Sequence, residues 1–225
     1  MKAADLSAAL AELPAAWRDV LPGWTPERLD EVRRCIEAVS GERPIAPEDP
    51  LRALRLVAPS DVKVVVLGQD PYPSPGHADG LAFSAGKGRP RSLGRVFEVL
   101  AADRPGFVPP DRWSLEGWAR AGVLLLNPVL TVEVGRIGSH ESCGWQALTS
   151  EIVSWLARRD DSPTILLWGA KARAFWDRCR PSECRATVLG TRHPSYDFQR
   201  TFMGEGSHFE ATAHLVDWWA IGRRS

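Results

Sequence analysis

One stretch decides the fold, Val62-Lys63-Val64-Val65-Val66-Leu67-Gly68-Gln69-Asp70-Pro71-Tyr72. Its first half is a run of apolar, mostly β-branched residues, which is typical of a strand buried on both faces of a parallel sheet. The run stops at Gly68, and an amide, a carboxylate and a phenol follow on a turn that Pro71 stiffens. In an open parallel sheet, ligands bind just beyond the carboxyl ends of the strands. We therefore expect the residues after Gly68 to lie at a functional site, and a strand followed by an ordinary Asp-Pro turn is the plain alternative.

Three further apolar runs resemble the first, at residues 121–126, 164–168 and 186–191. Helical patterns lie between the runs, at residues 92–102, 113–120 and 144–158. Strands that alternate with helices predict an α/β fold, here a three-layer α/β/α sandwich with a central four-stranded, mostly parallel sheet. Asp70, Asn127 and His193 each follow an apolar run. Because the carboxyl ends of parallel strands meet at one edge of a sheet, we expect these three side chains to converge there.

The size and composition indicate one globular domain spanning residues 1–225. The chain is 44% hydrophobic and 25% charged, as globular proteins are. Residues 1–45 form a helical N-terminal segment in this interpretation, with a helix from Pro26 to Ser40 after Thr25 as its N-cap. Lys plus Arg equal Asp plus Glu at 28 each, which argues against a nonspecific polybasic binder. A local basic groove remains compatible with that balance.

The sequence contains nothing that predicts a membrane protein or a metalloprotein. Its apolar runs are far shorter than the roughly 18 residues that span a bilayer, and the N-terminus lacks a signal-type apolar core. We therefore expect a cytoplasmic protein that does not bind membranes. The four cysteines form no C-x-x-C pair, so we expect buried free thiols and no metal site or cofactor. They are Cys35, Cys143, Cys179 and Cys184.

Five short motifs occur in order along the chain: Gly68-Gln69-Asp70-Pro71-Tyr72, Gly80-Leu81-Ala82-Phe83-Ser84, Leu124-Leu125-Leu126-Asn127-Pro128-Val129-Leu130-Thr131, Leu167-Trp168-Gly169 and His193-Pro194-Ser195. They resemble the ordered motifs of family 1 uracil-DNA glycosylases over residues 44–219. Ser139-His140, Gly144-Trp145 and Ser207-His208-Phe209 add to the resemblance. The resemblance implies hydrolysis of the N-glycosidic bond between uracil and deoxyribose in DNA, with no metal or cofactor. A monomer is the default expectation.

Two residues are the candidates for the chemistry. Such an enzyme flips the nucleotide out of the duplex and reads its base in a pocket. By similarity to the family, Asp70 is the carboxylate that stabilises the cationic sugar and orients or deprotonates water. His193 suits a hydrogen-bond donor to the departing uracil O2, as a neutral imidazole that donates from one nitrogen. The plain structural alternatives are an N-cap Asp and a capping or core histidine.

Four residues are the candidates for binding the base. The Asn127 amide can pair with O4 and N3–H of uracil, whereas cytosine presents the reverse pattern. Phe83 is a stacking platform for the flipped base, although an ordinary core Phe fits the sequence equally well. Tyr72 lies against C5 in the family and excludes the thymine methyl group. Gln69 lines the same pocket through its backbone or its amide.

The candidates for DNA contact lie on three loops. Arg91 and Ser92 follow a basic segment that takes the place of the family's Pro-rich loop, and Ser92 is a good N-cap whose hydroxyl or helix N-terminus can meet a phosphate. Gly169 matches the Gly of a Gly-Ser loop that has lost its serine here, leaving a backbone N–H for phosphate. Ser195 belongs to the histidine motif.

The clearest departures from the family mark a divergent member. Pro73 stands where the family has a histidine. Asp197 aligns with the leucine that the family wedges into the duplex, and an acid cannot fill a base stack. We hypothesise that Tyr196, Phe198 or both supply the wedge and that Arg200 holds the backbone. The altered loop also predicts weaker binding by protein inhibitors that mimic DNA.

Three alternatives to a uracil-specific enzyme stay open on the sequence. A glycosylase with another substrate range is one, although Asn127 and Tyr72 speak against it. A noncatalytic reader of uracil-containing DNA is another, although Asp70 and His193 speak against that. A generic nucleotide-binding protein is the third, but no G-x-G-x-x-G or phosphate-loop motif occurs. Preference for single- or double-stranded DNA is not determined by the sequence.

Overall fold

The computed structural model describes residues 1–2, 5–197 and 199–221, with the side chain of Tyr196 excepted. Its helices are α1 (Leu6–Ala9), α2 (Ala15–Val20), α3 (Pro26–Ser40), α4 (Arg52–Leu56), α5 (Arg91–Asp103), α6 (Glu116–Arg120), α7 (Trp145–Arg158), α8 (Ala170–Cys179) and α9 (His208–Ala211), with short 3-10 turns at Pro59–Asp61 (η2), Pro194–Tyr196 (η3) and Trp218–Ala220 (η4). Its strands are β1 (Ile45–Ala46), β2 (Val64–Leu67), β3 (Val123–Leu126), β4 (Val132–Glu133), β5 (Thr164–Trp168) and β6 (Val188–Thr191).

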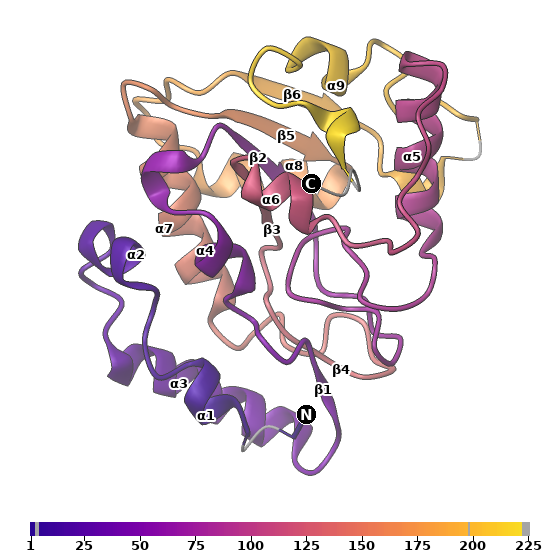
Figure 1. The fold of residues 1–225 in the computed structure, drawn as a ribbon. Coiled ribbons are helices and arrows are strands. Elements are labelled where there is room, and N and C mark those ends of the chain that lie inside the picture. The colour runs from indigo at the N-terminus through magenta and orange to yellow at the C-terminus, as the bar shows by residue number, and fades with distance from the viewer. Residues whose placement is uncertain (3–4, 198, 222–225) are drawn as a thin grey trace.

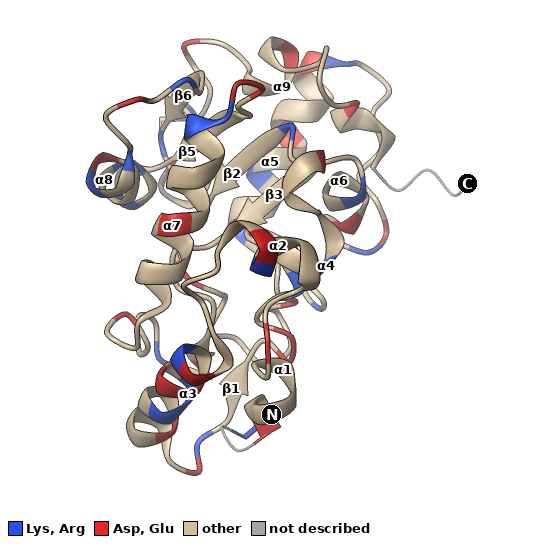
Figure 2. Cartoon of the chain, turned by 90° about the vertical axis from the view of Figure 1, so that its left-hand side faces the viewer, with Lys and Arg blue, Asp and Glu red and all other residues tan. Residues whose placement is uncertain are grey.

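A parallel four-stranded sheet forms the centre of the fold, in the order β3-β2-β5-β6 (Figure 1). Strand β2 is central: Val64 pairs with Val123 on one side and with Thr164 on the other. All four residues of β2 and of β3 are buried, as expected for apolar β-branched and leucine runs between two layers of helices. Figure 2 shows α7 and α8 on one side of the sheet and α4 and α6 on the other. The predicted α/β sandwich is confirmed.

The N-terminal segment is fastened to the loop that follows β3. Strand β1 pairs antiparallel with β4, and the Val134 N–H donates to the Pro44 carbonyl at 2.8 Å. His140 is fully buried, and its Nε2 lies 2.8 Å from the Ser40 hydroxyl at the end of α3. Residues 40–46 therefore support the chain around β4 from one side.

The expectation that Ser92 caps a helix is wrong. Helix α5 begins at Arg91 with Pro90 at the N-cap position, so Ser92 lies inside the first turn and is 2% exposed. Proline there has the extended backbone that a cap position needs, and its preset φ lets the helix begin directly after it.

The thiols are not uniformly buried. Among the four cysteines only Cys143 is buried, and Cys184 is exposed because the segment after α8 runs over the surface. No three His, Cys, Asp or Glu side chains among the described residues lie close enough together to hold a metal ion. Within the same residues, no helix is both long and apolar enough to cross a membrane.

Candidate active site

Three polar side chains meet in one cavity at the carboxyl edge of the sheet. Asp70 follows β2, Asn127 follows β3 and His193 follows β6, and all three line a cavity of about 180 Å³. The predicted site residues that line it are Gln69, Asp70, Tyr72, Phe83, Ser92, Asn127, His193 and Ser195. The sequence-based expectation that these distant residues converge is therefore met by the geometry.

The Asp70 carboxylate is half-buried and held by one backbone donor. The Gly138 N–H donates to its Oδ2 at 2.9 Å. Burial raises the pKa of Asp70 above its ordinary value, and the Gly138 hydrogen bond, the Lys171 charge and a hydrogen bond from Gln69 oppose that rise, whereas Glu141 adds to it. A raised pKa makes a carboxylate a stronger base towards water.

The His193 ring is held in one tautomer by its own turn. The Ser195 N–H donates to His193 Nδ1 at 3.1 Å, so Nδ1 acts as an acceptor and a neutral ring carries its proton on Nε2. Burial lowers the pKa of His193 and favours that neutral form. Gly169 makes room for this residue, because a Cβ at Gly169 would lie 2.8 Å from the His193 Cβ.

Asn127 and Phe83 both line the cavity, and each is closely packed against its neighbours. Asn127 is 8% exposed, and a Cβ added to Gly68 would lie only 2.2 Å from its Oδ1. Phe83 has a positive φ of 64°, which a non-glycine residue adopts only when its surroundings impose it. Its ring lies 5.7 Å from the His193 ring and 5.0 Å from the Trp168 ring, between centroids.

The Tyr72 side chain is fixed at its far end. Its hydroxyl is hydrogen-bonded to the Phe83 carbonyl at 3.1 Å and to the Ser92 hydroxyl at 2.7 Å. Burial raises the pKa of Tyr72 to about 12, so the phenol stays neutral. The Ser92 hydroxyl is buried and bonded to Tyr72, so a phosphate contact by this hydroxyl or by the helix N-terminus stays a prediction.

Replacing Gly68 with Ala is expected to slow the glycosylase reaction that the sequence resemblance implies by on the order of 10- to 100-fold, because the new methyl group displaces the Asn127 amide from its place in the cavity. Single-turnover release of base from DNA measures the effect. Gly23→Ala is the matched control, since Gly23 has an ordinary φ and only the flexible end of Arg28 lies within 4 Å of a Cβ built there. Equal rates for both variants would contradict the close contact.

Three further candidates for DNA contact, Arg91, Gly169 and Arg200, are not among the residues that line the cavity. Arg91 is exposed at the first position of α5. The Gly169 N–H donates to the Thr191 carbonyl at 2.9 Å and completes the pairing of β5 and β6, so a phosphate contact by a backbone N–H of this loop stays a prediction for the amides that follow. Phe198 and the side chain of Tyr196 lie outside the described residues.

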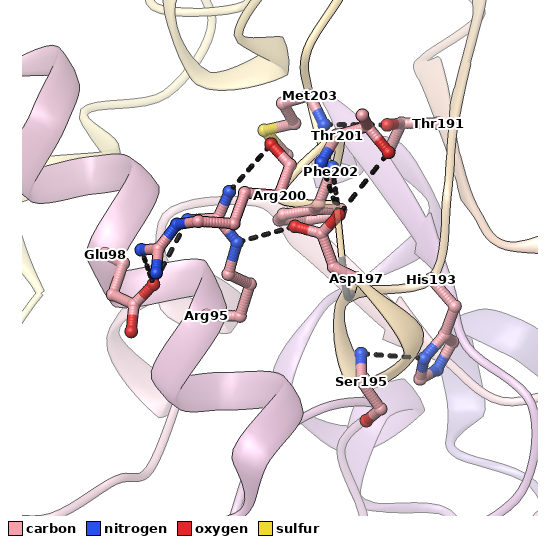
Figure 3. Close-up of polar contacts among 10 residues, drawn as sticks. All are labelled: Arg95, Glu98, Thr191, His193, Ser195, Asp197, Arg200, Thr201, Phe202 and Met203. Atoms are coloured by element: carbon pink, nitrogen blue, oxygen red, sulfur yellow. Dashed lines mark hydrogen bonds and ion pairs between the residues drawn. The ribbon is translucent and has the colours of Figure 1, made fainter.

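The loop after His193 is folded around a buried carboxylate (Figure 3). Asp197 does not occupy a projecting position: its side chain is 2% exposed and pairs with Arg95 of α5 at 2.7 Å. It also accepts hydrogen bonds from the backbone N–H groups of Thr201 and Phe202. Burial opposes ionisation, but the Arg95 guanidinium and these donors hold the pKa of Asp197 below its ordinary value. The loop thus closes on an internal ion pair.

The Arg200 side chain turns to α5. Its guanidinium lies 2.7 Å from Glu98 Oε2, and the Arg200 carbonyl accepts from Arg95 at 3.4 Å (Figure 3). The guanidinium remains largely exposed. An exposed ion pair of this kind is weak enough to exchange its partner for another anion.

Sequence reasoning missed the segment that completes the site. Gly138 supplies the donor to Asp70, and Ile137 beside it lines the cavity. The available signal in the sequence was the pair of glycines Gly135 and Gly138. In the structure both have positive φ, at 89° and 71°. Such glycines mark a turn whose backbone approaches another group closely.

Comparison with known proteins identifies the family of the chain. The profile of the uracil DNA glycosylase superfamily matches residues 55–219. A curated uracil-DNA glycosylase of Albidiferax ferrireducens is 47% identical over 222 residues, covering 90% of this chain and 88% of that protein. One of Bordetella parapertussis is 43% identical over 236 residues, covering 96% and 90%. The mimivirus uracil-DNA glycosylase structure has the same fold, with a TM-score of 0.71 at 23% identity over 83% of this chain and 71% of that one.

The fold, the cavity and these relatives together define a DNA repair glycosylase, an enzyme that hydrolyses N-glycosidic bonds. The chain belongs to the uracil DNA glycosylase superfamily, and the base that it removes from DNA is uracil.

Proposed function

We propose that the chain excises uracil by the family 1 route: the nucleotide is flipped out of the DNA, its base enters the cavity, and free uracil and an abasic site result. The supporting observation is that Asp70, Asn127 and His193, which follow three different strands, line one cavity. A carboxylate, an amide and an imidazole are the groups needed at the sugar, the base edge and the leaving anion.

In this mechanism the bond between C1′ and N1 breaks, and its electron pair leaves with the uracil ring. The Nε2–H of His193 donates to O2 of the departing anion. The Asp70 carboxylate stabilises the positive charge at C1′ and accepts the proton of the water that adds there. The Gly138 hydrogen bond keeps the carboxylate in place for this task.

The base is selected by shape and by hydrogen bonding. The Asn127 amide pairs with O4 and N3–H of uracil and leaves the reversed edge of cytosine unsatisfied, which a buried site penalises heavily. Phe83 stacks on the base, and Gln69 lines the same pocket. Tyr72 lies against C5 and leaves no room for a thymine methyl group.

The Tyr72→Ala variant is expected to release thymine from DNA, because removing the ring opens space at C5. The two hydrogen bonds of the Tyr72 hydroxyl hold that ring in the wild type. Release of labelled thymine from a thymine-containing duplex is the measurement. Tyr72→Phe, which keeps the ring, is the matched control and should stay inactive on thymine. A Tyr72→Ala enzyme that retains uracil activity and still ignores thymine would remove this role.

DNA passes over the rim of the cavity in this proposal. Arg91 and the N-terminus of α5 meet the phosphate backbone, as do Ser195 and Arg200, and Tyr196, Phe198 or both enter the base stack. Because the Gly169 N–H is engaged, the phosphate contact near that loop falls to the following amides of α8.

The partner of the enzyme is uracil-containing DNA, and we propose that it acts as a monomer. A mimivirus relative has been solved in complex with UGI. We infer weak binding of such an inhibitor here, because Asp197 takes the place of the family's projecting leucine and is turned inward to Arg95.

One assay tests the proposal against its alternatives. The enzyme is incubated with single-stranded and duplex DNA containing uracil, and alkali-labile abasic sites are counted. Free uracil supports the proposed reaction. Release of another base would indicate an altered substrate range, and binding without release would indicate a noncatalytic reader.

A further inference from the structure

An exposed apolar side chain stands at the cavity that takes the base. Ile137 is 66% exposed and lines the cavity together with Asp70. Only one other large hydrophobic side chain among the described residues is comparably exposed, Val108 at 77%. Val108 lines a separate hollow beside Trp219. Single exposed apolar residues are ordinary on protein surfaces, so the position of Ile137, rather than its exposure alone, is informative.

The segment that carries Ile137 is fixed before any DNA arrives. The Gly135 N–H donates to the Pro73 carbonyl at 2.8 Å, and the Gly138 N–H donates to Asp70 Oδ2 at 2.9 Å. The Glu133 N–H donates to the Ser139 hydroxyl at 2.7 Å across the same turn. Because the backbone of this turn is already held by hydrogen bonds, little further backbone freedom is lost when Ile137 makes a contact.

A flipped nucleotide brings its neighbours to this position. When the base occupies the cavity, its sugar and the adjacent nucleotides stay at the cavity mouth, and the base next to the gap has lost a stacking partner. That base face and the sugar carbons are apolar surfaces newly open to water. An aliphatic side chain at the mouth can cover them, as apolar side chains do where they enter unstacked base steps.

We propose that Ile137 is a DNA-contacting residue that packs against the sugar or base of the nucleotide next to the extruded one. The inference rests on the proposed function and adds a contact from the segment that follows β4. Ile137 takes no part in the chemistry. It stabilises the flipped complex by removing apolar surface from water, and it lies beside the donor that orients Asp70.

The test compares Ile137→Ser with the matched control Val108→Ser on two substrates. One is a uracil-containing duplex, and the other is a single deoxyuridine flanked by phosphates with no neighbouring base. On the duplex, Ile137→Ser should lose about tenfold in kcat/KM, mostly through KM, the amount expected from uncovering much of one aliphatic side chain. On the minimal substrate its loss should stay below about twofold, the same as for Val108→Ser on either substrate.

A conservative variant makes the test independent of folding. Ile137→Leu keeps the apolar area and should retain wild-type kcat/KM, and since position 137 is exposed, both variants should melt with the wild type. Equal kcat/KM for Ile137→Ser and Val108→Ser on the duplex would overturn the inference. An equal loss on both substrates would overturn it too, because that result indicates a displaced Asp70 rather than a contact with a neighbour. A wild-type enzyme that releases no uracil from the duplex would instead reject the proposed function.

Discussion

Replacing Asp70 with Asn is expected to slow single-turnover release of uracil by on the order of 10³-fold or more, while the affinity for DNA changes little. The substitution keeps the size and the hydrogen bond from Gly138 but removes the negative charge that faces the sugar cation. It also removes the group that accepts the proton from water. Rapid-quench kinetics on a uracil duplex give the rate, and a binding titration gives the affinity.

Asp111→Asn is the matched control, since Asp111 is exposed and lines a different hollow. A rate for Asp70→Asn close to that of the control would reject the assignment of Asp70.

The pH profile adds a second readout for the same residue. Because burial raises the pKa of Asp70, the acid limb of kcat should lie above the pH at which an ordinary aspartate titrates. Lys171 lowers that pKa and Glu141 raises it, so Lys171→Gln should move the limb to higher pH and Glu141→Gln to lower pH. If the acid limb moved in the same direction in both variants, it would belong to a group other than Asp70.

Replacing His193 with Leu is expected to lower the excision rate by on the order of 10²–10³-fold with little change in KM, because a preorganised donor to the leaving base is lost. The aliphatic side chain retains most of the contact with Phe83 and leaves no N–H in the cavity. His214→Leu, at an exposed position, is the control.

The protonation state of His193 can be tested in the wild type. Burial lowers its pKa, so the ring is already neutral at neutral pH and the rate should not fall as the pH rises through the ordinary range of histidine. A rate that disappears as imidazolium is lost would contradict donation by the neutral ring.

The sequence was sufficient for the sheet and for the three residues that converge on it. Runs such as Val64–Leu67 are buried on both faces and end at polar groups, so strand type and the edge that carries the site follow from pattern alone. Motif order indicated a uracil-DNA glycosylase, and the comparisons confirm that superfamily.

Tertiary contacts could not be predicted from the sequence pattern. Whether the Ser92 hydroxyl caps a helix or bonds to Tyr72 depends on how α5 packs, and the adjacent Pro90 decided the helix start. Asp197 reads as a surface acid in the sequence, because its partner Arg95 is 102 residues away along the chain. The Gly138 donor is a backbone group and leaves no side-chain signature.

Helix α5 joins two parts of the site that are far apart in the chain. Its first turn holds Tyr72 through Ser92, and its second turn holds the histidine loop through Arg95 and Asp197. Helix α5 therefore sets the spacing between Tyr72, which selects the base, and His193, which assists its departure. A DNA phosphate that displaced this helix would therefore move Tyr72 and the histidine loop together.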